Sequence, residues 1–182
     1  KDTVVITANP FYNKEHFKKR TGRELDNTFH TVFQAWSTDW NEEEGTVMPE
    51  KIVEKVETAE KLFPEKRKII HFMQPHYPFI NSDIDVAGYG SAFQEDAENK
   101  KNIWQQMEGG RKDHEEVIKG YKDNFTVMKP RLKDLQTVLT GETYITADHG
   151  NLIGESGFYG HPPSSKAKPL RKVPWDNIEN IN

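Results

Sequence analysis

One carboxylate and two imidazoles recur within a short stretch near the end of the sequence. Asp148 and His149 begin an Asp-His-Gly turn after the run at 143–147, and His161 follows in a Gly-His-Pro sequence. Carboxylate oxygen and imidazole nitrogen suit a divalent ion, and glycine lets the backbone bend where a strand stops. We therefore predict a metal site at Asp148, His149 and His161, for zinc, manganese, calcium or magnesium. The competing interpretation is a strand-end turn in which Asp148 caps the next segment and His149 covers the sheet edge.

The sequence also predicts which elements position these groups. Three runs of β-branched or apolar residues are expected to form buried strands: 3–7, 68–73 and 143–147. Asn9, His76 and the Asp148-His149 pair each follow one of these runs. In an open parallel α/β sheet, the loops at the carboxyl ends of the strands build the site. We therefore expect these groups to converge.

Helical patterns fill the spaces between the predicted strands. Pro49 opens the clearest of them, at the first-turn position that proline favours, and Pro64 ends it. Pro130 is expected to kink a longer helix or divide it in two. The expected helices cover residues 14–20, 49–63, 95–107 and 111–139, and residues 29–36 are expected to form a short strand or an extended arm. The alternation favours a single α/β domain over residues 1–182, with a mostly parallel sheet and helices on both faces.

The ordered motifs resemble the metal-binding end of the alkaline phosphatase superfamily. That superfamily includes sulfatases, lipoteichoic acid synthase-type phosphotransferases and cofactor-independent phosphoglycerate mutases. The resemblance is strongest toward the sulfatase-like hydrolases of archaea, and it implies their α/β fold. It covers about two thirds of the chain, from Arg67 to Asp176, with a weaker match from Thr3 to Pro10. The segments that carry it are 71–79, 143–151, 160–162 and 170–175.

The resemblance implies roles for particular residues. In the superfamily a strand that ends in Asp-His-Gly supplies metal ligands, and a later Gly-His turn often supplies another, which matches Asp148, His149 and His161. A Pro-His-x-Pro loop directs its imidazole into the anion site, which implies that His76 binds substrate. Glu155 occupies a Gly-Glu position and is implied as a partner behind a ligating imidazole. The simpler interpretations are a surface loop for His76 and a solvated turn acid for Glu155.

The resemblance also implies a reaction, metal-assisted transfer at a phosphoryl or sulfuryl centre. The ion stabilises charge on the attacking and leaving oxygens, and a Ser, Thr or formylglycine nucleophile forms a covalent intermediate. Superfamily members carry the nucleophile and an acidic ligand before the strand matched to Thr3–Thr7, and this chain has no cysteine for conversion to formylglycine. We therefore expect the carboxyl-terminal part of a hydrolase or transferase acting on phosphate or sulfate esters, inactive by itself. Thr7 matches a strand where the superfamily places no nucleophile.

A second interpretation comes from another class of protein. The chain would then be a noncatalytic α/β binding or interaction module that keeps the scaffold of such an enzyme and has lost its chemistry. This interpretation predicts no firm metal binding. His71 lies inside an apolar run and is interpreted as a core histidine in preference to a ligand.

The composition restricts the partners. The net charge of −4 gives no electrostatic reason to expect nucleic acid, and no apolar run approaches the roughly 20 residues of a membrane-spanning helix. We expect a soluble protein, cytoplasmic in preference to secreted. An uncovered sheet edge is expected near Val4–Thr7 or Ile69–Phe72, where a preceding strand would normally pair. The chain should then self-associate through that edge or require an upstream segment for solubility.

Overall fold

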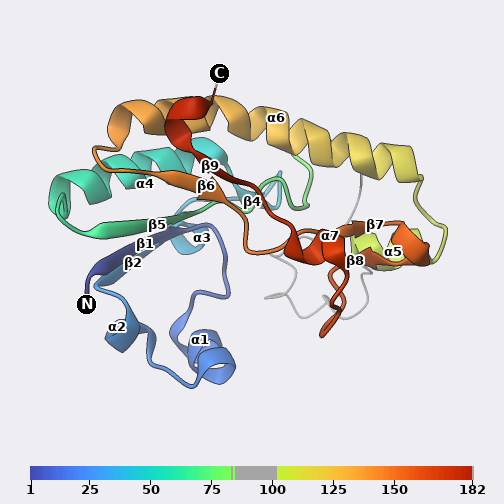
Figure 1. Ribbon diagram of the computed structural model, residues 1–182, viewed down its shortest axis with the longest axis horizontal. Helices are drawn as coiled ribbons and strands as arrows, with labels where there is room; N and C mark the ends of the chain where they lie inside the picture. The colour runs from blue at the N-terminus through green and yellow to red at the C-terminus, as the bar shows by residue number, and fades with distance from the viewer. Residues whose placement is uncertain (83, 85–101, 182) are drawn as a thin grey trace.

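The computed structural model describes residues 1–82, 84 and 102–181, and Figure 1 shows how its elements are arranged. In chain order the elements are β1 (Thr3–Thr7), α1 (Lys14–Thr21), α2 (Leu25–Thr28), β2 (Thr31–Gln34), α3 (Ala35–Thr38), β3 (Trp40–Asn41), β4 (Thr46–Val47), α4 (Pro49–Leu62), β5 (Arg67–His71), α5 (Ile103–Glu108), α6 (His114–Val138), β6 (Tyr144–Thr146), β7 (Leu152–Ile153), η3 (Glu155–Gly157), β8 (Tyr159–Gly160), α7 (Lys168–Arg171), β9 (Trp175–Asn177) and η4 (Ile178–Asn180). This order confirms a mixed α/β class. Among the described helices, none combines the length and apolar character needed to cross a membrane.

A three-stranded parallel sheet in the order β2-β1-β5 forms the centre of the fold (Figure 1). Val5 pairs with Val32 on one side and with Ile69 on the other. Because β1 has a strand on each side, Val4 to Thr7 are buried, as the β-branched run predicted. The alternative that placed an uncovered edge at Val4–Thr7 is therefore wrong. The β5 strand is one of the two edge strands of this sheet, and Ile69 on it is 45% exposed, so the prediction of a fully buried strand at 68–73 is also wrong.

The main core lies between the sheet and helices α4 and α6, and α1 and α2 lie on the other side of the sheet (Figure 1). Helix α4 begins at Pro49 and turns the apolar face predicted for it toward the core. Helix α6 continues through Pro130 from His114 to Val138, so the proline does not divide it. Loss of one backbone hydrogen bond at proline costs about 3 kcal/mol. Burial of Met128, Leu132 and Leu135 contributes about 1.5–3 kcal/mol per side chain, which outweighs that cost.

A second, smaller core supports the other end of the molecule. It joins α5, the first half of α6 and the loop after β5, and its buried members are Tyr77, Phe79, Ile84, Ile103, Trp104, Met107 and Val117. Helix α5 begins at Ile103, with a capping box on Asn102. The helix expected over 95–107 is therefore observed only in its last part, because residues 95–101 lie outside the described residues.

The strand that leads into the Asp-His-Gly motif differs most from the prediction. The expected buried parallel strand at 143–147 is the short strand β6, which pairs antiparallel with β9 and belongs to a separate two-stranded sheet. Tyr144 is exposed and stacks on Trp175, with ring centroids 5.3 Å apart. Aromatic and β-branched residues suit any pleated surface, so the composition of the run did not distinguish a buried strand from an exposed one.

Candidate functional site

The Asp-His-Gly turn follows β6 and is held by close contact with α7. The Gly150 N–H donates a hydrogen bond to the Leu170 carbonyl at 3.1 Å. A Cβ atom on Gly150 would lie 2.1 Å from the Pro169 carbonyl oxygen, well inside van der Waals contact. Only glycine allows this close approach of the two backbones. The glycine of the motif therefore determines where Asp148 and His149 stand.

The structure brings three of the predicted site imidazoles together. The ring centroids of His149 and His161 are 4.4 Å apart, and those of His76 and His161 are 6.1 Å apart. The three residues come from the loop after β5, the turn after β6 and the segment after β8. Distant parts of the chain thus supply one cluster of imidazoles.

Both imidazoles of the β6–β8 region are oriented through Nδ1. The Nδ1 atom of His149 lies 2.9 Å from the Gly150 carbonyl, and that of His161 lies 3.0 Å from Asn151 Oδ1. Because these oxygens can only accept hydrogen bonds, the Nδ1 atoms carry the protons. The Nε2 atoms of His149 and His161 then carry lone pairs, which is the tautomer that ligates a metal ion through Nε2.

A hydrogen-bonded chain stands behind His161. Asn151 accepts from His161 and donates through Nδ2 to the hydroxyl of Tyr121 on α6, at 3.1 Å. Burial raises the pKa of Tyr121, so the hydroxyl stays neutral. Sequence reasoning missed both residues. The one available signal was the position of Asn151, directly after the motif.

His76 is positioned by a buried amide that the sequence reasoning also missed. The Nδ1 atom of His76 lies 2.6 Å from the Tyr77 carbonyl. Asn124, fully buried on α6, donates to the carbonyls of His76 and Pro78 at 2.8 and 2.9 Å, and its Oδ1 accepts from the Ile80 N–H at 2.8 Å. One side chain thus satisfies three backbone groups of the loop that carries His76.

Asp148 supplies the negative charge next to these imidazoles. Its side chain is 72% exposed, its Oδ1 accepts from the His149 N–H at 2.9 Å, and its Oδ2 lies 3.6 Å from His149 Nε2. The charge acts on groups from other elements. Burial raises the pKa of Tyr12 and the Asp148 charge raises it further, whereas burial lowers the pKa of His71 and Asp148 opposes that effect. The Asp148 charge therefore influences groups at the end of the central sheet as well as the imidazoles.

The surroundings keep two of the imidazoles neutral. Burial lowers the pKa of His76 to about 4, although the hydrogen bond to the Tyr77 carbonyl opposes the effect. Burial also lowers the pKa of His161, and the neighbouring His149 adds to that effect. Neutral imidazole is the form that binds metal ions. His161 therefore needs no high pH to present a nitrogen ligand.

Thr7 and His71 form the floor of this region at the end of the central sheet. Thr7 Oγ1 lies 3.2 Å from His71 Nδ1 and accepts a hydrogen bond from the Asn9 N–H at 3.0 Å. Thr7 is fully buried, so its hydroxyl is not presented to a substrate. The side chain of Asn9 is used in a local turn, where its Oδ1 accepts from the Phe11 N–H at 2.9 Å.

Glu155 has a local role in the turn between β7 and β8. Its Oε2 accepts from the Ile153 N–H at 2.6 Å. Within the described part of the chain, no imidazole hydrogen-bonds to this carboxylate. The group behind His161 is Asn151, as the 3.0 Å contact shows.

The spacing of the donor atoms can be compared with that of ligands on one divalent ion. Two imidazoles that bind one ion through Nε2 have centroids roughly 4.5–6 Å apart, and two adjacent ligand atoms lie roughly 3–3.5 Å apart. The His149–His161 separation of 4.4 Å and the Asp148–His149 atom separation of 3.6 Å are close to these values. Among residues 1–82, 84 and 102–181, no three His, Asp or Glu side chains are arranged to hold an ion as they stand. The residues therefore fit a divalent ion in donor type and in pairwise separation.

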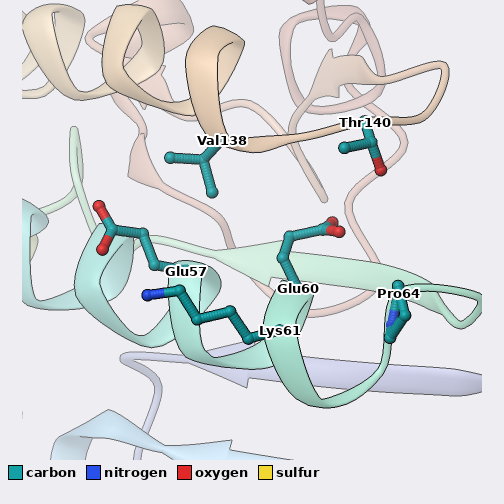
Figure 2. Close-up of a pocket in the computed structure, with 6 residues that line it drawn as sticks. All are labelled: Glu57, Glu60, Lys61, Pro64, Val138 and Thr140. Atoms are coloured by element: carbon teal, nitrogen blue, oxygen red, sulfur yellow. The ribbon is translucent and has the colours of Figure 1, made fainter.

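One hollow in the surface is lined by none of these residues. It has a volume of about 450 Å³ and is lined by Glu57, Glu60, Lys61, Pro64, Val138 and Thr140, between the ends of α4 and α6 (Figure 2). Glu60 forms an ion pair with Lys68 at 3.1 Å. A second hollow, of about 290 Å³, lies beside α1 and includes Tyr12. Tyr12 lies edge-on to His71, with ring centroids 5.8 Å apart.

Comparisons with protein families, curated proteins and solved structures found no match to this chain.

Proposed function

We propose that this chain forms the metal- and anion-binding part of a site for the hydrolysis or transfer of phosphate or sulfate esters, as in the sulfatase-like members of the alkaline phosphatase superfamily. The observation that carries the proposal is the Asp148-His149-His161 cluster, in which two imidazoles 4.4 Å apart carry Nε2 lone pairs beside a carboxylate. Asp148, His149 and His161 are the proposed ion ligands. A divalent ion bound there would stabilise negative charge on the ester oxygens.

The chain's own residues have distinct tasks in this proposal. Asn151 and Tyr121 hold the His161 ring through Nδ1 and leave the Nε2 lone pair available to an ion. His76 is the proposed substrate contact, since its loop is fixed by Asn124 and its ring lies 6.1 Å from that of His161. Thr7 is not proposed as a nucleophile, because it is buried and its oxygen already accepts the Asn9 N–H.

Calorimetric titration with manganese and zinc tests the ligand assignment. We expect Asp148→Ala, His149→Ala and His161→Ala each to lower ion affinity by about 10-fold or more. The free energy of unfolding should change by less than about 1 kcal/mol, because these side chains contribute little to the core. His30→Ala, which removes an exposed imidazole elsewhere, is the matched control. Unchanged affinity in Asp148→Ala would contradict the assignment.

One observation favours the second candidate, a noncatalytic α/β binding module. In the described part of the chain, no three donor side chains are at ligand spacing as they stand. This candidate predicts that manganese and zinc bind no better to the natural chain than to the Asp148→Ala variant. The same titration therefore separates the two functions.

A further inference from the structure

A shallow groove beside α1 combines aromatic side chains with one cationic group. Its volume is about 290 Å³, close to the lower end of the roughly 300–1,000 Å³ typical of small-molecule sites. Its lining consists of Phe11, Tyr12, His16, Phe17, Arg20 and Thr21. The size suits a single ring with one or two substituents.

The wall of the groove is ordered by contacts among its own residues. The rings of Phe11 and His16 are stacked, with centroids 4.4 Å apart and an angle of 23° between the planes. His16 Nε2 accepts a hydrogen bond from Arg20 Nε at 3.3 Å. This contact uses one of the five N–H donors of the guanidinium. The planar fork of arginine suits carboxylate and phosphate ligands.

Arg20 differs from two other cations of the same helix. Lys14 pairs with Asp26 at 2.5 Å, and Lys18 pairs with Glu24 at 2.5 Å. Within the part of the chain that the structure describes, no carboxylate forms an ion pair with Arg20. The groove therefore has positive charge that no described acidic side chain neutralises, and a ligand with an acidic group would complement it.

The groove approaches the end of the central sheet through Tyr12. The Tyr12 ring lines the groove and lies edge-on to the ring of His71, with centroids 5.8 Å apart. After burial, the second influence that raises the pKa of Tyr12 is the negative charge of Asp148. Tyr12 therefore links the groove to His71 at the end of β5, the strand that leads to the His76 loop.

We propose that this groove binds the alcohol part of an ester substrate, in the form of a compact aromatic ring that carries an acidic group. The ring would pack against the aromatic lining of Phe11 and Tyr12, and the acidic group would bind Arg20. This inference rests on the proposed function, because the ester group would point from the groove toward Asp148 and the imidazoles.

Three probes separate the groove from the ester site. They are 4-carboxyphenyl phosphate, phenyl phosphate and 4-hydroxybenzoate, each titrated calorimetrically into the full chain in the presence of manganese. In Arg20→Ala we expect binding of 4-carboxyphenyl phosphate and of 4-hydroxybenzoate to weaken by about 10-fold, whereas binding of phenyl phosphate changes by less than about 3-fold. Lys19→Ala, which removes the adjacent cation of α1, should leave all three within about 2-fold.

A second variant protects the test against a change in α1 itself. Arg20→Lys keeps the charge without the planar fork, and we expect it to recover part of the lost affinity. If 4-hydroxybenzoate fails to bind and Arg20→Ala leaves 4-carboxyphenyl phosphate unchanged, the groove proposal is overturned while the ester function stands. If 4-hydroxybenzoate binds through Arg20 and neither phosphate ester binds more tightly than it does, the ester function is overturned and the groove keeps its acidic aromatic ligand.

Discussion

At the scale of single residues, the candidate site depends on side chains that orient its imidazoles as much as on the imidazoles themselves. His161 is held by Asn151, which is in turn held by Tyr121 on α6. His76 depends in the same way on Asn124. Groups that orient a metal-ligating histidine typically change metal affinity when they are removed. The geometry of the cluster is therefore set by neutral amides and a phenol.

The hydrogen bonds from His161 to Asn151 and from Asn151 to Tyr121 predict an effect on metal affinity. Residues with only a structural role would change stability and not affinity. Asn151→Ala should lower manganese affinity by about 10-fold, and Tyr121→Phe should lower it by a smaller factor. Neither variant should lose much stability. Tyr144→Phe is the matched control, because its hydroxyl bonds only the exposed Glu142 at 2.6 Å. Calorimetric titration provides the affinities and urea unfolding the stabilities. Equal affinities in Asn151→Ala and the natural chain would show that His161 needs no such support.

The sequence predicted the residues of the imidazole cluster but not their supports. A carboxylate and an imidazole after one run, with another imidazole nearby, can be recognised from residue type and order. Asn124 lies in the apolar stripe of α6 that includes Val117, Met128 and Leu132, where it is a single polar interruption. Such an interruption indicates a buried hydrogen bond, but the pattern does not identify the partner. The backbone groups it satisfies are more than 40 positions away in the sequence, as its bonds to Ile80 and His76 show.

At the scale of elements, α6 connects the main core to the site. Its second half packs on α4, and its first half contacts the loop that carries His76. The sequence predicted the long helix because its apolar spacing is regular. It did not predict that the central sheet would have so few strands. The β6 strand has the composition of a core strand, but among the described strands it pairs only with β9. Which strand pairs with which depends on contacts between distant segments that residue composition does not encode.

The contact of α6 with the His76 loop predicts the effect of a single methyl group. A Cβ atom on Gly120 would lie 2.5 Å from Phe79 Cδ2, so Gly120→Ala forces the loop and the helix apart. Overpacking of this kind costs about 1–3 kcal/mol. Alanine gains at most about 1 kcal/mol over glycine in helix propensity, so we expect Gly120→Ala to lower the free energy of unfolding. Gly141→Ala, with no atom within 4 Å of its Cβ, should be nearly neutral. Urea unfolding of both variants checks the difference, and equal stabilities would contradict it.

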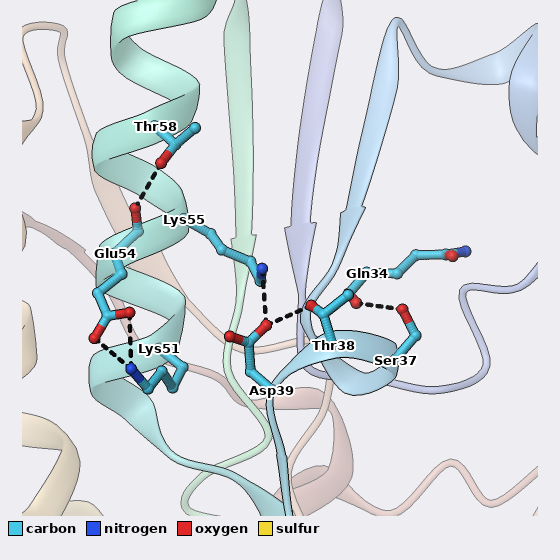
Figure 3. Close-up of polar contacts among 8 residues, drawn as sticks. All are labelled: Gln34, Ser37, Thr38, Asp39, Lys51, Glu54, Lys55 and Thr58. Atoms are coloured by element: carbon cyan, nitrogen blue, oxygen red, sulfur yellow. Dashed lines mark hydrogen bonds and ion pairs between the residues drawn. The ribbon is translucent and has the colours of Figure 1, made fainter.

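A polar contact between α3 and α4 predicts a pH effect. Asp39 Oδ2 lies 2.8 Å from Lys55 Nζ and also accepts the Thr38 hydroxyl, and both side chains of the ion pair are 22% exposed (Figure 3). Burial raises the pKa of Asp39, but Lys55 and Thr38, with Lys51 further away, outweigh burial and hold the pKa below its ordinary value. The folded state therefore releases this proton more readily than the unfolded state. The resulting stability is complete above the unfolded pKa of about 3.9 and is lost as the pH falls through the folded pKa.

Replacement of Asp39 tests this sign. Asp39→Asn should lower the free energy of unfolding at neutral pH by about 0.5–1 kcal/mol, and the difference from the natural chain should shrink toward zero near pH 3. Glu54→Gln, which removes an exposed carboxylate that pairs with Lys51 on the same helix, should have little effect at either pH. Urea unfolding at both pH values measures the change. A difference that grows as the pH falls would contradict the assigned direction.

At the scale of the whole molecule, the central sheet ends at β5 in an edge that no described strand covers. The Arg67 N–H donates a hydrogen bond to the Asp2 carbonyl, and the His71 carbonyl accepts one from the Ala8 N–H. The backbone N–H and C=O groups of the odd-numbered residues of β5 therefore point toward β1. Lys68 and Ile70 therefore direct their backbone groups toward the other edge, where no described strand pairs with them. Edge strands are commonly protected by outward-pointing lysines. Here the Lys68 ammonium is bound to Glu60 at 3.1 Å with only 9% of its side chain exposed, so it does not protect the edge.

We therefore expect the chain to self-associate through β5 as its concentration rises. Ile69 is 45% exposed on this strand, and Ile69→Lys should shift sedimentation velocity profiles toward the monomer by placing charge on the edge. Leu62→Lys is the matched control, because Leu62 is 60% exposed at the end of α4 and contributes nothing to the edge. A general effect of added charge on solubility would act equally in the two variants, whereas strand pairing requires that only Ile69→Lys reduce association. A natural chain that remains monomeric at all concentrations, or a Leu62→Lys variant that dissociates as readily as Ile69→Lys, would show that the β5 edge does not pair.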